Sequence, residues 1–105
     1  MLRIYETMLE MVRDLGPMIE TIAKRDGGLG DQMRRAVQSV VLNTAEAMGS
    51  RGKNRQARYH SALGSMRETW ACVEVAAALG YVEMPSRAVE EKMRHVSRTL
   101  VKLTA

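Results

Sequence analysis

The sequence is poor in the residues that build disulfides, zinc sites and aromatic cores. It holds a single cysteine, Cys72, no phenylalanine, one tryptophan, three tyrosines and two prolines. One cysteine cannot form an internal disulfide, and no set of cysteine and histidine residues has the spacing that zinc requires. The roughly 18 consecutive apolar residues of a membrane span occur nowhere, and charges interrupt the N-terminal stretch MLRIYETMLEMVRD. The sequence therefore predicts a cytoplasmic protein that is neither secreted nor inserted in a membrane.

Methionine and aliphatic side chains dominate what is present. The 105 residues include nine methionines, and 46% of the chain is hydrophobic against 27% charged. With many alanine, valine and leucine residues, this mixture favours packed helices over sheets and is too apolar for a disordered chain. A chain of this length can bury one core. We expect a single all-α domain over residues 1–105, without strands.

Apolar residues recur in alternating steps of four and three, the spacing of a helical stripe packed against a partner. The first helix is predicted roughly from 3 to 24, with a kink at Gly16 and Pro17 because proline cannot donate to the carbonyl four residues back. The run DGGLGD, residues 26 to 31, should end this helix and start the second, over about 30 to 49.

Two further helices follow the basic run RGKNRQAR, residues 51 to 58, which is interpreted as a turn. The third and longest helix should end at Gly80 as its C-terminal cap, and the fourth should start after Pro85 with Ser86 as N-cap. The four predicted stripes are Ile4, Met8, Met11, Leu15, Met18 and Ile22; Leu29, Met33, Ala36, Val40, Asn43 and Ala47; Tyr59, Leu63, Met66, Trp70, Val73 and Ala77; and Val89, Met93, Val96, Leu100 and Leu103. Short connections predict an antiparallel up-down-up-down four-helix bundle. Asn43 is interpreted as a buried, hydrogen-bonded structural residue.

Positive charge is concentrated in the middle of the chain. Residues 32 to 67 hold seven basic residues and one acidic residue, Glu46, for a local balance of plus six, whereas the other residues hold nine basic and eleven acidic groups, for minus two. The cluster Arg51, Lys53, Arg55 and Arg58 is interpreted as a phosphate-binding patch that projects from one end of the bundle. The alternative is a solvated loop whose cations keep the protein soluble.

The stretch between Gln32 and Tyr81 resembles a known family. Its pieces are Q-x-R-R-A, S-V-V-L-N-x-A-E, G-x-R-G-K, A-L-G-S-x-x-E and L-G-Y, with unbroken spacing between them. These motifs are similar to those of the small bacterial four helix bundle proteins, first associated with intervening sequences in 23S ribosomal RNA genes. The chain departs from the pattern at Val41, where many members have proline, and at Ala47, where many have glycine.

The resemblance implies a four-helix bundle that assembles into a ring, commonly a homopentamer. It extends to the accessory variability proteins of diversity-generating retroelements, which are basic, bind nucleic acid and suggest a reverse transcriptase as a partner. The residues that match as phosphate contacts are Arg34, Arg35, Arg51, Lys53 and Arg55. With Arg58 from the charge pattern, they form the predicted nucleic-acid-binding set.

No catalytic or metal-binding constellation accompanies the basic cluster, so no cofactor is expected. Glu91 and His95 are four residues apart and unrepeated, which favours a salt link on a helix surface over a metal site. Cys72 is interpreted as a small buried hydrophobic residue. We therefore predict a non-enzymatic, oligomeric bundle that binds RNA or DNA. The alternative is a protein-interaction scaffold without a direct nucleic-acid role.

Overall fold

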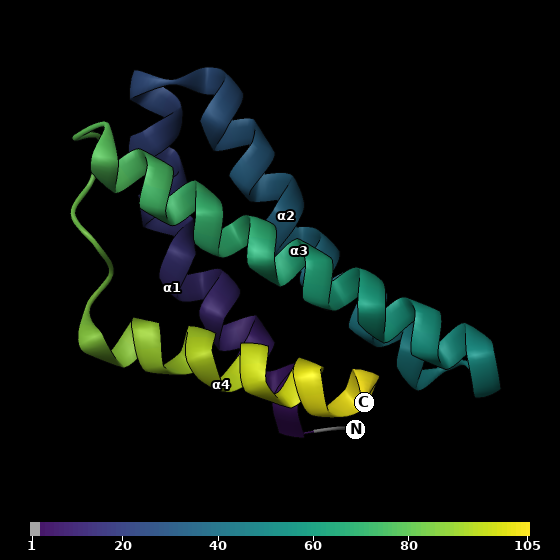
Figure 1. Cartoon of the computed structure of the whole chain (residues 1–105). Helices are drawn as coiled ribbons and strands as arrows, with labels where there is room; N and C mark the ends of the chain where they lie inside the picture. The colour runs from purple at the N-terminus through teal and green to yellow at the C-terminus, as the bar shows by residue number, and fades with distance from the viewer. Residues whose placement is uncertain (1–2) are drawn as a thin grey trace.

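The computed structural model describes residues 3–105, which form four helices: α1 (Arg3–Arg25), α2 (Gly27–Met48), α3 (Gly52–Ala78) and α4 (Arg87–Thr104). No strand occurs within these described residues. α2 and α4 each pack against both α1 and α3. α1 and α2 connect at the upper left of Figure 1, and α2 and α3 connect at the lower right. The prediction of an all-α chain with four helices is confirmed.

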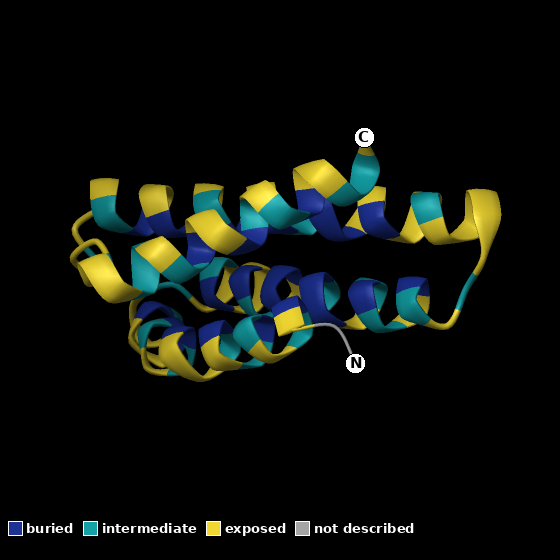
Figure 2. Cartoon of the chain, turned by 90° about the horizontal axis from the view of Figure 1, so that it is seen from below, coloured by how far each residue is buried: buried dark blue, intermediate teal, exposed yellow. Residues whose placement is uncertain are grey.

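The hydrophobic core lies between the helices, where each contributes one stripe, drawn in dark blue in Figure 2. Five methionines have no exposed surface at all: Met8, Met11, Met33, Met66 and Met93. Their unbranched, flexible side chains can fill irregular gaps, a role that larger aromatic rings would serve less easily. A core of methionine and aliphatic residues thus forms in a chain without phenylalanine.

One residue, Asp26, separates α1 from α2. Its carboxylate caps α2 by accepting a hydrogen bond of 3.0 Å from the backbone nitrogen of Leu29. The run DGGLGD thus ends α1 and starts α2, as predicted, but its glycines lie in the first turns of α2, which starts at Gly27 rather than near residue 30. Gly30 permits the close approach of the two helices, because a Cβ atom there would lie 2.7 Å from the Cα of Ala23.

The basic run at 51 to 58 is also helical, so its interpretation as a turn is wrong. α3 begins at Gly52, whose φ of +57° lies in the left-handed region that glycine adopts without a steric penalty. The connection from α2 is confined to residues 49–51. Lysine, arginine, glutamine and alanine are good helix formers, so the run continues α3 once its first turn has formed.

Several predicted core positions are shifted along their helices. In α1 the buried residue is Ile19 rather than Met18, and in α2 it is Thr44 rather than Asn43. α1 continues through Pro17 as one helix, as predicted. The predicted stripes repeat every 3.5 residues, whereas a straight helix has 3.6 residues per turn. After a few turns of α1 and α2, the buried residue is therefore the one that follows the predicted position.

The indole of Trp70 is only half-buried and donates from Nε1 to the Ser97 hydroxyl at 3.0 Å. Thr69 takes the buried place in α3. At the end of α3, Gly80 adopts a φ of +77° immediately after the C-cap residue, Leu79. The Ser86 hydroxyl accepts a hydrogen bond from the Val89 nitrogen at 3.3 Å, which confirms the predicted N-cap of α4.

Candidate nucleic-acid interface

The six predicted phosphate contacts fall into two separate groups. Arg34 and Arg35 lie near the start of α2, whereas Arg51, Lys53, Arg55 and Arg58 lie at the start of α3, beyond the other end of α2. The 14 residues from Arg34 to the end of α2 at Met48 correspond to about 21 Å along the helix at about 1.5 Å per residue. The single continuous basic face expected from helix two and the following turn is therefore divided.

The two arginines of α2 already have carboxylate partners. Arg34 pairs with Glu20 of α1 at 3.0 Å, and Arg35 pairs with Asp31 at 3.1 Å. All four side chains are substantially exposed, between 41% and 79%. Exposed pairs of this kind are worth only about 0 to 1 kcal/mol, so a polyanion could compete for either arginine. Their own carboxylates nevertheless cancel the local positive charge.

The four cations at the start of α3, here called the basic end, have a different environment. Across residues 3–105, none of these four side chains forms an ion pair. All four are exposed, and Glu46 is the one acidic residue between positions 32 and 67. The basic end therefore presents uncompensated positive charge to solvent.

Polar contacts hold the connection at the basic end in place. Ser50 donates from its hydroxyl to the Glu46 carbonyl at 2.8 Å, and Asn54 donates to the Ser50 hydroxyl at 2.9 Å. Arg51 is the N-cap residue of α3 but makes no capping hydrogen bond with its side chain. The first backbone N–H groups of α3 thus add to the positive potential of the arginines and lysine around them.

The groups considered for other chemistry do not assemble into a site. Cys72 is buried, and this burial, followed by the charge of Glu68, raises the pKa of its thiol. Glu91 and His95 form no salt link in the part of the chain that the structure describes, and Arg94 pairs with Glu90 instead, at 3.3 Å. No three histidine, cysteine or acidic side chains among residues 3–105 could together hold a metal ion.

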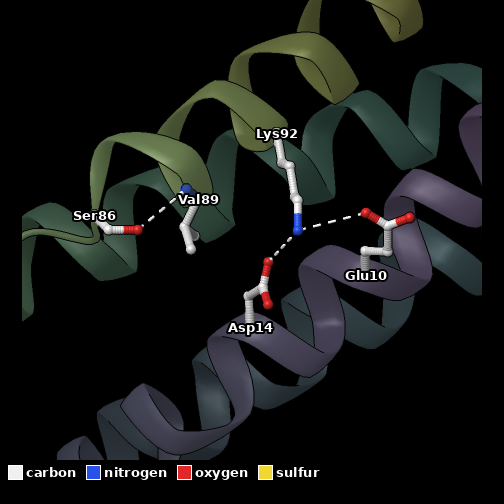
Figure 3. A network of polar contacts seen from close by, with 5 residues as sticks. All are labelled: Glu10, Asp14, Ser86, Val89 and Lys92. Atoms are coloured by element: carbon white, nitrogen blue, oxygen red, sulfur yellow. Dashed lines mark hydrogen bonds and ion pairs between the residues drawn. The ribbon is translucent and has the colours of Figure 1, made fainter.

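An ion-pair network joins α1 and α4 beside an open groove that is lined in part by Lys92 (Figure 3). Lys92 of α4 lies 2.7 Å from an Asp14 oxygen and 3.4 Å from a Glu10 oxygen, both on α1. The hydrogen bond to Asp14 is the largest cause of a raised Lys92 pKa. This network joins two helices and neutralises the charge of Lys92.

Asn43 belongs to a polar contact between α2 and α3. Its amide donates to the Ser39 carbonyl at 3.0 Å and to the Ser39 hydroxyl at 2.9 Å. The Ser65 hydroxyl of α3 completes the contact at 2.7 Å from the Ser39 hydroxyl. Asn43 is half-buried rather than buried, but its interpretation as a hydrogen-bonded structural residue is confirmed.

No helix within residues 3–105 is both long and apolar enough to cross a membrane. A family model for the 23S rRNA-intervening sequence protein matches residues 1–102. A solved crystal structure of a protein of unknown function from the S23 ribosomal protein family of Bacteroides thetaiotaomicron aligns with a TM-score of 0.83. The alignment covers 96% of this chain and 97% of that one at 15% identity, so this likeness concerns the fold alone. No curated protein matches the sequence.

Proposed function

Because the chain belongs to the 23S rRNA-intervening sequence protein family, we propose that it is a non-enzymatic cytoplasmic protein that binds RNA or DNA through its basic end. The observation that carries this proposal is the absence of ion pairs at Arg51, Lys53, Arg55 and Arg58 within residues 3–105. Close cations without internal carboxylates repel one another, and a polyanion relieves this repulsion. Binding then releases the small ions condensed on the nucleic acid.

Contacts are to the phosphate backbone rather than to bases. Tyr59, the aromatic residue beside the basic end, is only 4% exposed and cannot act as a stacking platform. Phosphate contacts fix position on a nucleic acid but carry no sequence information directly. We therefore expect weak sequence preference and strong dependence on salt.

Self-association is a second part of the proposal. The four helices form an up-down-up-down bundle whose copies assemble into a ring, as in the homopentamers implied by the family resemblance. The alternating places of the helix connections in Figure 1 support this topology. An apolar groove between α1 and α2, lined by Leu9, Val12, Gln38, Val41 and Leu42, supports a contact between copies. Leu42 is 63% exposed there, which favours a covered surface in the assembly.

A ring would concentrate charge. Five copies, each with a net charge of plus four, would carry about twenty positive charges in one particle. Native mass spectrometry measures the number of copies directly. A monomer at micromolar concentration would contradict the ring, and Leu42→Glu should dissociate it if the groove lies between copies.

Nucleic-acid binding is tested with labelled single-stranded RNA and DNA of mixed sequence across a salt series. The logarithm of the wild-type binding constant should fall linearly with the logarithm of the salt concentration. For a single strand the slope is about −0.7 per phosphate contact. The variant Arg51→Ser, Lys53→Ser, Arg58→Ser should flatten this dependence. A matched variant removes three exposed cations from α4 by the substitutions Arg87→Ser, Arg98→Ser and Lys102→Ser. This variant should keep the salt dependence of the wild type. Affinity that neither salt nor the first variant changes, or no binding at all, would favour the protein-interaction scaffold.

A further inference from the structure

Three arginines of the basic end continue the buried stripe of α3. Five residues of that stripe are completely buried: Ala62, Met66, Thr69, Val73 and Ala76. Counting back from Ala62 in steps of four, three and four leads to Arg58, Arg55 and Arg51. At about 100° per residue, Arg58 and Arg55 lie on the same side of the helix as the core, and Arg51 is the extended N-cap residue just before the first turn. The side of α3 that faces the core thus carries arginine at its first turns, here called the arginine edge.

The arginine edge is exposed because α1 and α4 end before reaching it. Figures 1 and 2 both show the turn between α2 and α3 extending beyond the ends of α1 and α4. The hydrogen bond between Trp70 and Ser97 places these two residues level with each other. From Ser97 to the end of α4 at Thr104 is about 10 Å along the helix, whereas from Trp70 back to Arg58 is about 18 Å. α4 therefore stops short of the arginine edge.

The chemistry of the arginine edge suits phosphate. All three side chains are arginine, whose planar guanidinium can donate two parallel hydrogen bonds to one phosphate. Arg55 is already oriented, because its Nε donates to the Ala47 carbonyl at 3.1 Å and leaves its terminal nitrogens free of that contact. From Gly52, the residue after Arg51, to Arg58 the helix rises about 9 Å, which is about the axial length of three nucleotides in one strand of a duplex at about 3.4 Å each.

We propose that the arginine edge, rather than the basic end as a whole, is the site at which up to three successive phosphates of one nucleic-acid strand bind. This inference rests on the proposed function and narrows it to one side of α3. Lys53 and Arg67 are exposed on the opposite side, since each lies about half a helical turn away from Arg51 and Arg58 respectively. They contribute general attraction without direct contact.

A nucleic-acid backbone fits this edge better than a partner protein. Protein interfaces depend on buried apolar or aromatic anchors at their centre. Between positions 51 and 58 the one exposed apolar residue is Ala57, and it does not lie on the edge. A phosphate backbone needs no such anchor, because its affinity comes from charge and hydrogen bonds.

The test compares two variants of equal charge on one helix. Arg51→Gln with Arg58→Gln changes the arginine edge, and Lys53→Gln with Arg67→Gln changes the opposite side. Arg55 is left intact because it bonds to the backbone. Binding of labelled single-stranded RNA is measured from about 50 to about 200 mM salt. The edge variant should make the slope of log binding constant against log salt shallower by about 1.4, because two contacts of about 0.7 each are lost. The opposite variant should keep nearly the wild-type slope.

A third variant, Arg51→Lys with Arg58→Lys, keeps the charge but removes the two-pronged geometry. It should retain the wild-type salt slope with weaker affinity, and circular dichroism should show all three variants folded. Equal losses in the edge and opposite variants, with steep salt dependence in the wild type, would overturn the arginine edge but leave nucleic-acid binding standing. A wild-type protein that binds neither RNA nor DNA would overturn both.

Discussion

The Nε atom of Arg55 donates a hydrogen bond of 3.1 Å to the carbonyl oxygen of Ala47, across the connection that joins α2 to α3. Ala47 belongs to the last turn of α2, where carbonyl groups lack partners within the helix. A cation there also interacts favourably with the negative end of the helix dipole. One arginine of the basic end therefore stabilises the fold as well as contributing charge.

Replacing Arg55 should consequently reduce stability. We expect Arg55→Ala to lower the free energy of unfolding by about 1 kcal/mol, since a net hydrogen bond is worth about that much. Arg58→Ala, which removes an exposed arginine without such a bond, should change it by less than about 0.5 kcal/mol. Urea denaturation followed by circular dichroism measures both values. Equal effects would show that the bond to Ala47 contributes nothing.

Replacing either of two glycines by alanine should change the free energy of unfolding, but in opposite directions at the two positions. At Gly30 an added Cβ would lie 2.7 Å from both the Cα and the Cβ of Ala23, so Gly30→Ala must push α1 and α2 apart. We expect a loss of about 1 to 3 kcal/mol. At Gly64, within α3, no atom lies within 4 Å of an added Cβ, and Gly64→Ala should gain about 0.5 to 1 kcal/mol. Thermal unfolding of the two variants checks the signs, and a stabilised Gly30→Ala would contradict the close approach.

The Lys92 network predicts a loss of stability at alkaline pH. The hydrogen bond to Asp14 raises the Lys92 pKa, and Glu10 adds to the effect. The stabilisation is therefore complete below the unfolded-state pKa of about 10.4 and is lost as pH rises through the higher folded-state value. The difference in melting temperature between wild type and Lys92→Met should be constant near neutral pH. It should shrink as pH rises through the raised pKa of Lys92. Lys102→Met, which removes an exposed lysine without an ion pair among the described residues, should show no such change.

The Cys72 thiol should react slowly with alkylating reagents in the folded protein. Its side chain is buried, and burial together with the Glu68 charge raises the thiol pKa, so little thiolate forms near neutral pH. Alkylation by iodoacetamide should be much slower in native protein than in protein unfolded with guanidinium. Similar rates in both states would show that the thiol is accessible. Mass spectrometry of the modified protein follows the reaction.

Helix positions were predictable where the signal is local. Ser86 as N-cap of α4 and Gly80 after the end of α3 follow from side-chain and backbone preferences that need no distant partner. The DGGLGD run was correctly predicted to end the first helix and start the second, with Asp26 as the cap residue, but the contact of Gly30 with Ala23 is one that only the packed helices create. The interpretation of RGKNRQAR as a turn gave its charge more weight than its helix-forming residues.

The division of the predicted phosphate contacts into two groups could not be predicted from the sequence. The family resemblance grouped Arg34 and Arg35 with the later cations. The folded chain gives both arginines carboxylate partners, Glu20 and Asp31, and sets them at the far end of α2. The sequence already shows that Arg58 lies four residues before Ala62, on the same helical stripe. Whether that stripe is covered or exposed at Arg58 depends on where the neighbouring helices end.

The sequence by itself determined that this protein is helical, where most helices begin and end, and that its positive charge gathers in the middle of the chain. These properties follow from periodicity, capping and composition, which act over a few residues. Tertiary structure alone decided that Arg34 pairs with Glu20 of another helix and which side of α3 remains open. The reason is physical: ion pairing and exposure depend on distances between helices, and the relative lengths of α3 and α4 leave Arg51, Arg55 and Arg58 uncovered.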